Sequence, residues 1–205
     1  MDVFIIGSGG NSKIVIDICE LLNYKIIGLF DDKYDGINIS TYKNYQIIGN
    51  IDDIRKYENI NIINSIGNNN IRHQIFQKLE KLNLNWINCI HPSSYISPSV
   101  KIGSGNIICN NAIINADAII GDHNLINTSC IIEHDCEIGN FNHFASKTTL
   151  CGGVEIGNLN LMGVGSSVLP GKKIGNNNII GGMSMIINNF GNDNTIVGIP
   201  GKIIK

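Results

Sequence analysis

The feature that most constrains this chain is a repeat of six residues that runs from Tyr95 to Phe190. Written in blocks of six from Tyr95, the chain begins YISPSV, KIGSGN, IICNNA, and the second residue of all sixteen blocks is Ile, Leu, Val, Met or Phe. An apolar side chain at every sixth position, with no insertion, repeatedly enters one interior. This pattern predicts a parallel β-helix, in which short strands wind around a single core.

A second period of 18 residues indicates that three blocks make one coil. Asparagine and glycine each recur at this interval, so residue i stacks on residue i+18 along about five coils. We expect the asparagines to hydrogen-bond along the solenoid and the glycines to mark tight backbone positions at one corner. The two series are Asn106, Asn124, Asn142, Asn160, Asn178 and Gly103, Gly121, Gly139, Gly157, Gly175.

Residues 1–90 carry a different pattern, in which short apolar runs alternate with amphipathic stretches. Strands are predicted at 3–6, 26–30, 60–66 and 86–90, and helices at 12–22 and 71–82. Strands that alternate with helices imply a parallel sheet. We therefore predict an α/β, Rossmann-like domain over residues 1–90 and a β-helix domain over residues 91–205.

Glycine and acidic residues follow the predicted strands of the first domain. The loop Gly7–Asn11 opens a helix, Asp31 and Asp32 end the second strand, and Gly67 ends the third. Ligands of parallel sheets bind at these carboxyl ends, and a glycine loop before a helix can hold phosphate. Asp31, 24 residues after Gly7, stands where a ribose-binding acid is found. The alternatives are an ordinary tight turn and an ordinary turn aspartate.

Composition excludes several other classes of protein. With 15 basic and 17 acidic residues the net charge is −2, which gives no attraction to nucleic acid or to an anionic membrane. No apolar run approaches 18 residues, and the first residues lack the basic region of a signal peptide. We expect a soluble, cytoplasmic protein. The six cysteines form no CxxC pair, so we expect reduced, buried thiols.

One outward column of the repeat is apolar except for a single histidine. Its members are Ile107, Leu125, His143, Leu161 and Ile179. An outward apolar column suggests that a neighbouring subunit covers it. A histidine that interrupts such a column is a candidate functional residue.

A second histidine, His134, stands at a corner whose other members are small or rigid. Ala116, Gly152 and Pro170 share its column, which leaves space around the imidazole, and Asp135 follows it directly. A carboxylate beside an imidazole can orient it and raise its basicity. The alternative is a solvated corner histidine. A zinc site would need three converging ligands. Because the other histidines occupy columns different from that of His134, we expect no metal site.

Taken together, the sequence resembles the hexapeptide-repeat, left-handed β-helix sugar acetyltransferases with an N-terminal nucleotide-sugar-binding domain. These include N-acetyltransferases of UDP- or dTDP-4-amino sugars, of the bacillosamine, viosamine and perosamine type, and sialic-acid O-acetyltransferases. The similarity covers nearly the whole chain. It is most specific in the segments IIGSGG, LFDD, IGNNNIR, ISPSV, LINTSCIIEHDCEIGNFNH, GVGSSVLP, IIGGMS and VGIPGK.

The resemblance implies a role for individual residues. It places the catalytic base on His134, its carboxylate partner on Asp135, and a contact to acetyl-CoA on His143. Three departures stand out: Asn11 replaces a frequent histidine, Asp135 replaces the usual glutamate, and the tail reads PGK instead of PAK. Further acetyl-CoA contacts map to Val164 and Gly182, and nucleotide-sugar contacts to Gly9, Gly10, Asn11, Asp31, Asp32 and Gly67.

The predicted chemistry is direct acetyl transfer from acetyl-CoA to the amine of a nucleotide-linked 4-amino-4,6-dideoxy sugar. His134 would remove the proton, and the Gly152 N–H would stabilise the thioester oxygen. A covalent route through nearby Cys151 is less favoured. The family forms homotrimers with sites between subunits. The alternatives are an O-acetyltransferase of a sialic-acid-type sugar and a non-catalytic assembly module.

Overall fold

The structure, a computed structural model, describes residues 1–36, 41–42 and 44–205. The chain divides into two compact units, Met1–Pro92 and Ser93–Lys205. Each unit is described on its own.

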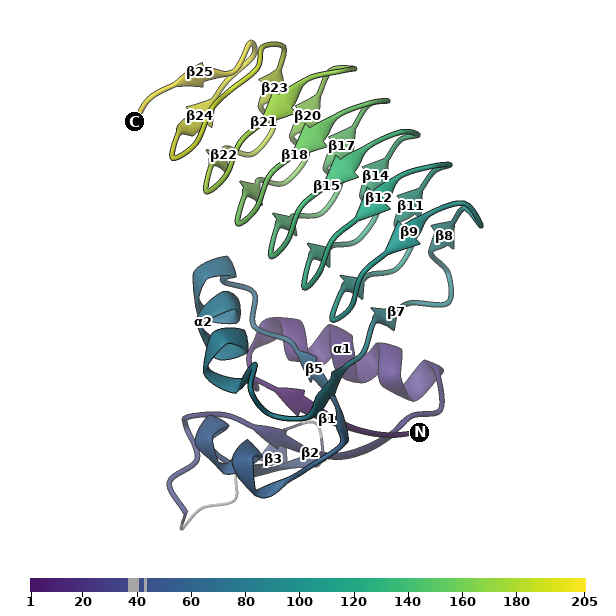
Figure 1. Ribbon diagram of the computed structural model, residues 1–205, viewed down its shortest axis with the longest axis vertical. Helices are drawn as coiled ribbons and strands as arrows, with labels where there is room; N and C mark the ends of the chain where they lie inside the picture. The colour runs from purple at the N-terminus through teal and green to yellow at the C-terminus, as the bar shows by residue number, and fades with distance from the viewer. Residues whose placement is uncertain (37–40, 43) are drawn as a thin grey trace. The chain divides into compact units, whose positions relative to one another are not determined.

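The first unit is a sheet flanked by helices, with strand order β3-β4-β2-β1-β5-β6 (Figure 1). Neighbouring strands are parallel except β3 and β4. This arrangement confirms the predicted α/β class. The elements are β1 (Asp2–Ile6), α1 (Gly10–Leu21), β2 (Lys25–Phe30), β3 (Thr41–Tyr42), β4 (Tyr45–Gly49), the 3-10 helix η1 (Ile51–Lys56), β5 (Ile60–Asn64), α2 (Asn69–Leu79), β6 (Leu84–Trp86) and β7 (Cys89–Ile90).

An aromatic cluster occupies part of the core of this unit. The Phe4 ring lies 5.8 Å from Phe30 and 5.2 Å from Tyr57, measured between ring centroids. The buried Ile54 and Leu79 join them, so η1 and α2 are held to the same core as the central strands. Such burial fixes the strand ends and the loops that follow them.

The first unit differs from the sequence prediction in two regions. The predicted strand 86–90 is two short strands, β6 and β7, and β3, β4 and η1 are not among the predicted elements. The segment that contains β4, YQIIG, is short and bounded by polar residues, so its pattern gave no clear strand signal. η1 begins at a capping box in which Asn50 and Asp53 bond each other's backbone N–H.

The second unit is a solenoid of two-residue strands stacked in parallel, which confirms the predicted left-handed β-helix (Figure 1). Strands β8 to β22 make five complete coils, each contributing one strand to each of three faces. The antiparallel pair β24 and β25 ends the chain. The strands of the first face are β8 (Tyr95–Ile96), β11 (Ile113–Ile114), β14 (Ile131–Ile132), β17 (Thr149–Leu150), β20 (Ser167–Val168) and β23 (Met185–Ile186). The strands of the second face are β9 (Lys101–Ile102), β12 (Ile119–Ile120), β15 (Glu137–Ile138), β18 (Glu155–Ile156) and β21 (Lys173–Ile174). The strands of the third face are β10 (Ile107–Ile108), β13 (Leu125–Ile126), β16 (His143–Phe144), β19 (Leu161–Met162), β22 (Ile179–Ile180) and β24 (Thr195–Val197), followed by β25 (Lys202–Ile203).

Each hexapeptide position has its own structural role. From Ile108 to Ile186 the second residue of every block is buried, as predicted, and the sixth is nearly always a small or amide side chain that is also buried. The fifth residue turns the corner with a positive φ in block after block, for example 58° at Asp135 and 57° at Phe141. A regular backbone therefore places side chains in columns that run the length of the unit.

The asparagine series forms the predicted hydrogen-bonded ladder. The backbone N–H of Asn142 donates to Asn124 Oδ1, and that of Asn160 donates to Asn142 Oδ1, both at 2.8 Å. Each amide Nδ2 also donates to the carbonyl of a glycine in the parallel series, as Asn142 does to Gly157 at 2.8 Å. The buried polar column is therefore satisfied at every coil.

The glycine series is explained by crowding and not by an unusual φ. A Cβ on Gly157 would lie 2.5 Å from Asn176 Oδ1 and 2.7 Å from the Gly175 carbonyl oxygen. Asn176 itself accepts the backbone N–H of Asn158 at 2.7 Å. Only glycine lets the next coil approach this closely.

The six cysteines are free thiols, five of them buried and Cys151 partly so. Burial raises the pKa of Cys109 to about 12. Such thiols behave as small apolar side chains.

The burial of the outward apolar column partly corrects the prediction that a neighbouring subunit covers it. Ile107 and Leu125 are each only 2% exposed within the single chain, so they need no neighbouring subunit to cover them. Leu161 is half-buried, and Ile179 is 48% exposed. The argument for a covering subunit therefore rests on the C-terminal part of the column alone.

Candidate active site and nucleotide pocket

His134 and Asp135 form an ion-pair-like contact at the corner between β14 and β15. The His134 Nδ1 atom lies 2.7 Å from Asp135 Oδ2. Asp135 occupies the fifth position of its block, where φ is 58°, and this backbone turn brings its side chain beside the preceding residue. With Nδ1 donating to the carboxylate, the lone pair on Nε2 is available to accept a proton.

Gly152 packs against the other edge of the imidazole from the next coil. A Cβ at this position would lie 2.7 Å from His134 Nε2 and 2.6 Å from Cε1. The coils are joined here by the Gly153 N–H, which donates to the His134 carbonyl at 2.9 Å. Any side chain at residue 152 would collide with the imidazole, which explains the small residue at this position of the column.

The electrostatics of this corner favour protonation of the imidazole. The hydrogen bond to Asp135 raises the His134 pKa above its ordinary value of 6.5, and the nearby charges of Asp135 and Glu133 raise it further. The side chains of His134 and Asp135 are 62% and 65% exposed in the single chain. The pair is a competent proton acceptor that this chain alone leaves open to water.

The three residues to which the resemblance assigns acetyl-CoA lie on successive coils. His143 begins β16 and is half-buried in register with Leu125 and Leu161. Val164 follows β19 and is 56% exposed, and Gly182 follows β22 in the same column. A Cβ on Gly182 would lie 3.3 Å from the Val164 carbonyl oxygen. Their contact with acetyl-CoA stays a prediction.

In the first unit, Asp31 is tied to the glycine loop. Its Oδ2 accepts from the backbone N–H and the hydroxyl of Ser8, both at 2.7 Å, and its Oδ1 accepts from the Lys33 N–H at 3.0 Å. Partial burial raises the Asp31 pKa, but these hydrogen bonds outweigh it and hold the pKa below its usual range. Asp31 therefore fixes the loop, and its direct contact with substrate stays a prediction.

The glycine loop opens onto the first turn of α1. Gly9 precedes the helix with no side-chain cap, and a Cβ on Gly9 or Gly10 would meet no atom within 4 Å. Asn11, in the first turn, packs against Gly67, because a Cβ on Gly67 would collide with the Asn11 amide nitrogen. The predicted residues of the two loops are thus brought together. A helix beginning with open space in front of it favours an anion.

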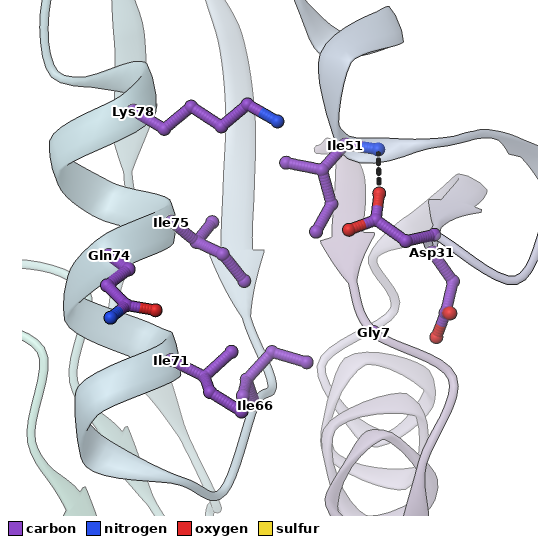
Figure 2. Close-up of a pocket in the computed structure, with 9 residues that line it drawn as sticks. Gly7, Asp31, Ile51, Ile66, Ile71, Gln74, Ile75 and Lys78 are labelled. Carbon is purple, nitrogen blue, oxygen red and sulfur yellow. Dashed lines mark hydrogen bonds between the residues drawn. The ribbon is translucent and has the colours of Figure 1, made fainter.

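Beside these loops lies a cavity of about 320 Å³, shown in Figure 2. Of the predicted substrate residues, Asp31 and Asp32 line it, whereas Gly9, Gly10, Asn11 and Gly67 lie outside its wall. Asp32 accepts the Ile51 N–H at 3.1 Å, the dashed line in Figure 2. The full lining is Gly7, Asp31, Asp32, Ile51, Ile66, Ile71, Gln74, Ile75 and Lys78.

Sequence reasoning missed the wall of this cavity that α2 provides. Ile71, Ile75 and Lys78 face the cavity from α2, and in Figure 2 their side chains extend from the helix toward Ile51 and Gly7. The sequence pattern predicts a helix over residues 71–82 and does not indicate that one of its faces lines a cavity. Ile71 is 47% exposed and lines the cavity instead of joining the core.

The comparisons with known proteins agree with this geometry. Residues 2–79 match the PglD N-terminal domain family. The solved structure of PerB from Caulobacter crescentus, in complex with CoA and GDP-perosamine, is 30% identical, with a TM-score of 0.92 over all of this chain and 98% of that one. This chain belongs to the hexapeptide-repeat sugar acetyltransferase family.

Other members of the family extend the comparison. The acetyltransferase domain of PglB from Neisseria gonorrhoeae, in complex with acetyl coenzyme A, is 25% identical, with a TM-score of 0.92 over 99% of this chain and 98% of that one. The UDP-N-acetylbacillosamine N-acetyltransferase of Bacillus subtilis is 33% identical over 52% of this chain. The chain spans half or less of the length of the curated relatives it matches.

Two features are absent from the described ranges, residues 1–36, 41–42 and 44–205. No helix there is long and apolar enough to span a bilayer. Within the same ranges, no group of three or more His, Cys, Asp or Glu side chains is placed to hold a metal ion.

Proposed function

We propose that this protein is an acetyl-CoA-dependent N-acetyltransferase that acetylates the amino group of a nucleotide-linked 4-amino-4,6-dideoxy sugar. The observation that carries the proposal is the His134–Asp135 pair, held at 2.7 Å with Gly152 leaving Nε2 accessible. The family supports the proposal, because the solved structure of its member PerB is in complex with CoA and GDP-perosamine.

The reaction needs one proton acceptor and no covalent intermediate. The sugar amine attacks the thioester carbonyl of acetyl-CoA, and His134 Nε2 takes the proton that the nitrogen must lose. The C–S bond then breaks, and coenzyme A leaves as a thiol once its sulfur is protonated. Asp135 stabilises the imidazolium through Nδ1, and the Gly152 N–H is our candidate donor to the thioester oxygen.

The two substrates are assigned to different parts of the chain. Acetyl-CoA is assigned to His143, Val164 and Gly182, which rise along consecutive coils of the solenoid. The nucleotide sugar is assigned to the glycine loop and the cavity of the first unit, where apolar side chains surround Asp32 and Lys78. An apolar pocket with few polar groups suits a nucleobase, and the helix start suits a diphosphate.

The exposure of His134 supports a homotrimer with active sites between subunits. An acyl-transfer site works best when water is excluded, yet the His134 side chain is 62% exposed in one chain. A second copy packed along the solenoid would close this corner. The trimer also agrees with the exposed Ile179 at the C-terminal end of the apolar column.

The proposal is tested by measuring coenzyme A release with a panel of acceptors. UDP-, dTDP- and GDP-linked 4-amino sugars are each compared with free sialic acids under the same acetyl-CoA concentration. We expect turnover with a nucleotide-linked amine, and we favour UDP or dTDP as the nucleotide. Turnover with free sialic acid alone would replace the proposal with sugar O-acetylation. Absence of acetyl-CoA binding at millimolar concentration would instead indicate a non-catalytic assembly module.

A further inference from the structure

Arg72 on α2 is a fully buried cation for which the proposed reaction has given no role. It is 1% exposed, and burial lowers its pKa to about 10, so the guanidinium is still charged at neutral pH. Burying a charge is costly unless something nearby needs it. The surroundings of Arg72 therefore indicate what it serves.

The guanidinium turns back to the loop that precedes its own helix. Nη1 donates to the carbonyls of Ile66 at 2.8 Å and Gly67 at 3.1 Å, and Nη2 donates to Asn69 Oδ1 at 3.3 Å. The loop is held from its other side by Asn64, whose Nδ2 donates to the Arg72 carbonyl at 3.2 Å. The two side chains thus tie the segment between β5 and α2 to the first turn of α2.

The two carbonyls that Arg72 binds belong to the residues that touch the glycine loop. A Cβ on Gly7 would lie 2.7 Å from Ile66 Cδ1, so the Ile66 side chain packs directly over Gly7. Its neighbour Gly67 packs in the same way against Asn11 in the first turn of α1. In Figure 2 the Ile66 side chain extends toward the loop that carries Gly7. Arg72 therefore holds in place the two residues that pack against Gly7 and Asn11.

We propose that Arg72 is a positioning residue for the diphosphate of the nucleotide sugar: it holds the Ile66–Gly67 loop against the glycine loop and places a buried positive charge beside the Ile66–Gly67 loop. This inference rests on the proposed function, because it requires a nucleotide diphosphate as the ligand. Nη1 holds the two carbonyls while Nη2 holds Asn69, and this planar set of donors is one that a lysine cannot reproduce.

The test measures the binding of UDP, dTDP and GDP, and of the matching nucleosides, to the full chain by calorimetry. In Arg72→Gln we expect the Kd of the preferred diphosphate to rise about 10- to 100-fold, the scale of one charge-assisted interaction, with the nucleoside changed less than about threefold. The KM for acetyl-CoA should stay within about twofold of wild type. Arg72→Lys, which keeps the charge without the planar set of donors, should lie between wild type and Arg72→Gln.

The matched control is Lys25→Gln, which removes a positive charge from an exposed side chain at the start of β2, at the opposite end of that strand from Asp31. We expect it to leave the diphosphate Kd within about twofold of wild type. An unchanged Kd in Arg72→Gln would overturn the inference. Equal loss of diphosphate and nucleoside binding, together with a lower Tm, would overturn it in favour of a purely structural role.

Three further outcomes are decisive. If Arg72→Gln does not fold, Arg72→Lys carries the test, since it keeps the charge but loses the planar set of donors and should weaken diphosphate binding more than nucleoside binding. If the wild-type chain binds none of the three diphosphates, the proposed function fails first and the inference with it. If the wild type binds and acetylates a nucleotide sugar while these variants match it, only the inference fails.

Discussion

At the scale of single residues, the division of labour between two histidines can be tested directly. His134→Ala removes the proton acceptor but leaves the pocket, so we expect kcat to fall about 10²- to 10⁴-fold with little change in the KM for acetyl-CoA. His143→Ala, the comparison variant, should raise that KM and reduce kcat less. Steady-state kinetics on both variants, with thermal melts to confirm folding, would show the split. Activity that merely follows the folded fraction in both would contradict the assignment.

The hydrogen bond between His134 and Asp135 also makes a prediction about pH. A general base works only when unprotonated, and Asp135 raises the pKa of His134 above 6.5. The acidic limb of kcat/KM should therefore be centred above pH 6.5. Asp135→Asn removes the raising interaction, so its limb should move to lower pH while the maximal rate falls. A limb that stays in place in Asp135→Asn would show that another group is titrating.

At the scale of elements, the solenoid could be predicted almost completely from the sequence, whereas the pocket of the first unit could not. In a repeat, residue i contacts residue i+18 by construction, so the Asn142–Asn124 and Gly152–His134 contacts follow from counting. The cavity instead joins Gly7, Ile51 and Ile75 from separate loops and helices. Their meeting depends on how β1, β5 and α2 pack, which no local period encodes.

The crowding of the glycine series gives a prediction with an internal control. In Gly157→Ala the added methyl would lie 2.5 Å from Asn176 Oδ1 and 2.7 Å from the Gly175 carbonyl oxygen. We expect the free energy of unfolding to fall by about 1–3 kcal/mol, the usual cost of overpacking. Gly191, whose carbonyl accepts from the same asparagine ladder, has no atom within 4 Å of an added Cβ.

Gly191→Ala should consequently change the free energy of unfolding by no more than about 0.5 kcal/mol, or stabilise slightly by restricting the unfolded chain. Urea unfolding of both variants beside wild type makes the comparison. Equal effects of the two substitutions would show that loss of glycine flexibility, and not close approach of the next coil, limits this column.

At the scale of the whole molecule, the question is what completes the exposed corner of His134. The prediction of a trimer was based on four apolar residues of the outward column. Two of them, Ile107 and Leu125, are already buried in one chain. What remains is Ile179 at 48% exposure and the half-buried Leu161. Fewer residues therefore support assembly than the sequence indicated, and these are Leu161 and Ile179.

We therefore predict that the chain forms a trimer and that Ile179 is needed for it. We expect a mass of about 67 kDa by light scattering, three times the 22.4 kDa chain. Ile179→Arg should shift the protein to the monomer, because an arginine in an apolar contact leaves a charge buried without a partner. The matched control is Ile119→Arg: Ile119 is 43% exposed but lies on another face, in register with Lys101 and Glu137.

If the active site is shared between subunits, kcat must fall when the trimer dissociates. Ile179→Arg should therefore lose most activity at low protein concentration and regain part of it as concentration rises, whereas Ile119→Arg should behave like wild type throughout. The concentration dependence separates lost assembly from a local defect, since a damaged site would be inactive at every concentration. A wild-type monomer, or a fully active monomeric Ile179→Arg, would show that one chain is sufficient and that His134 functions in the open corner.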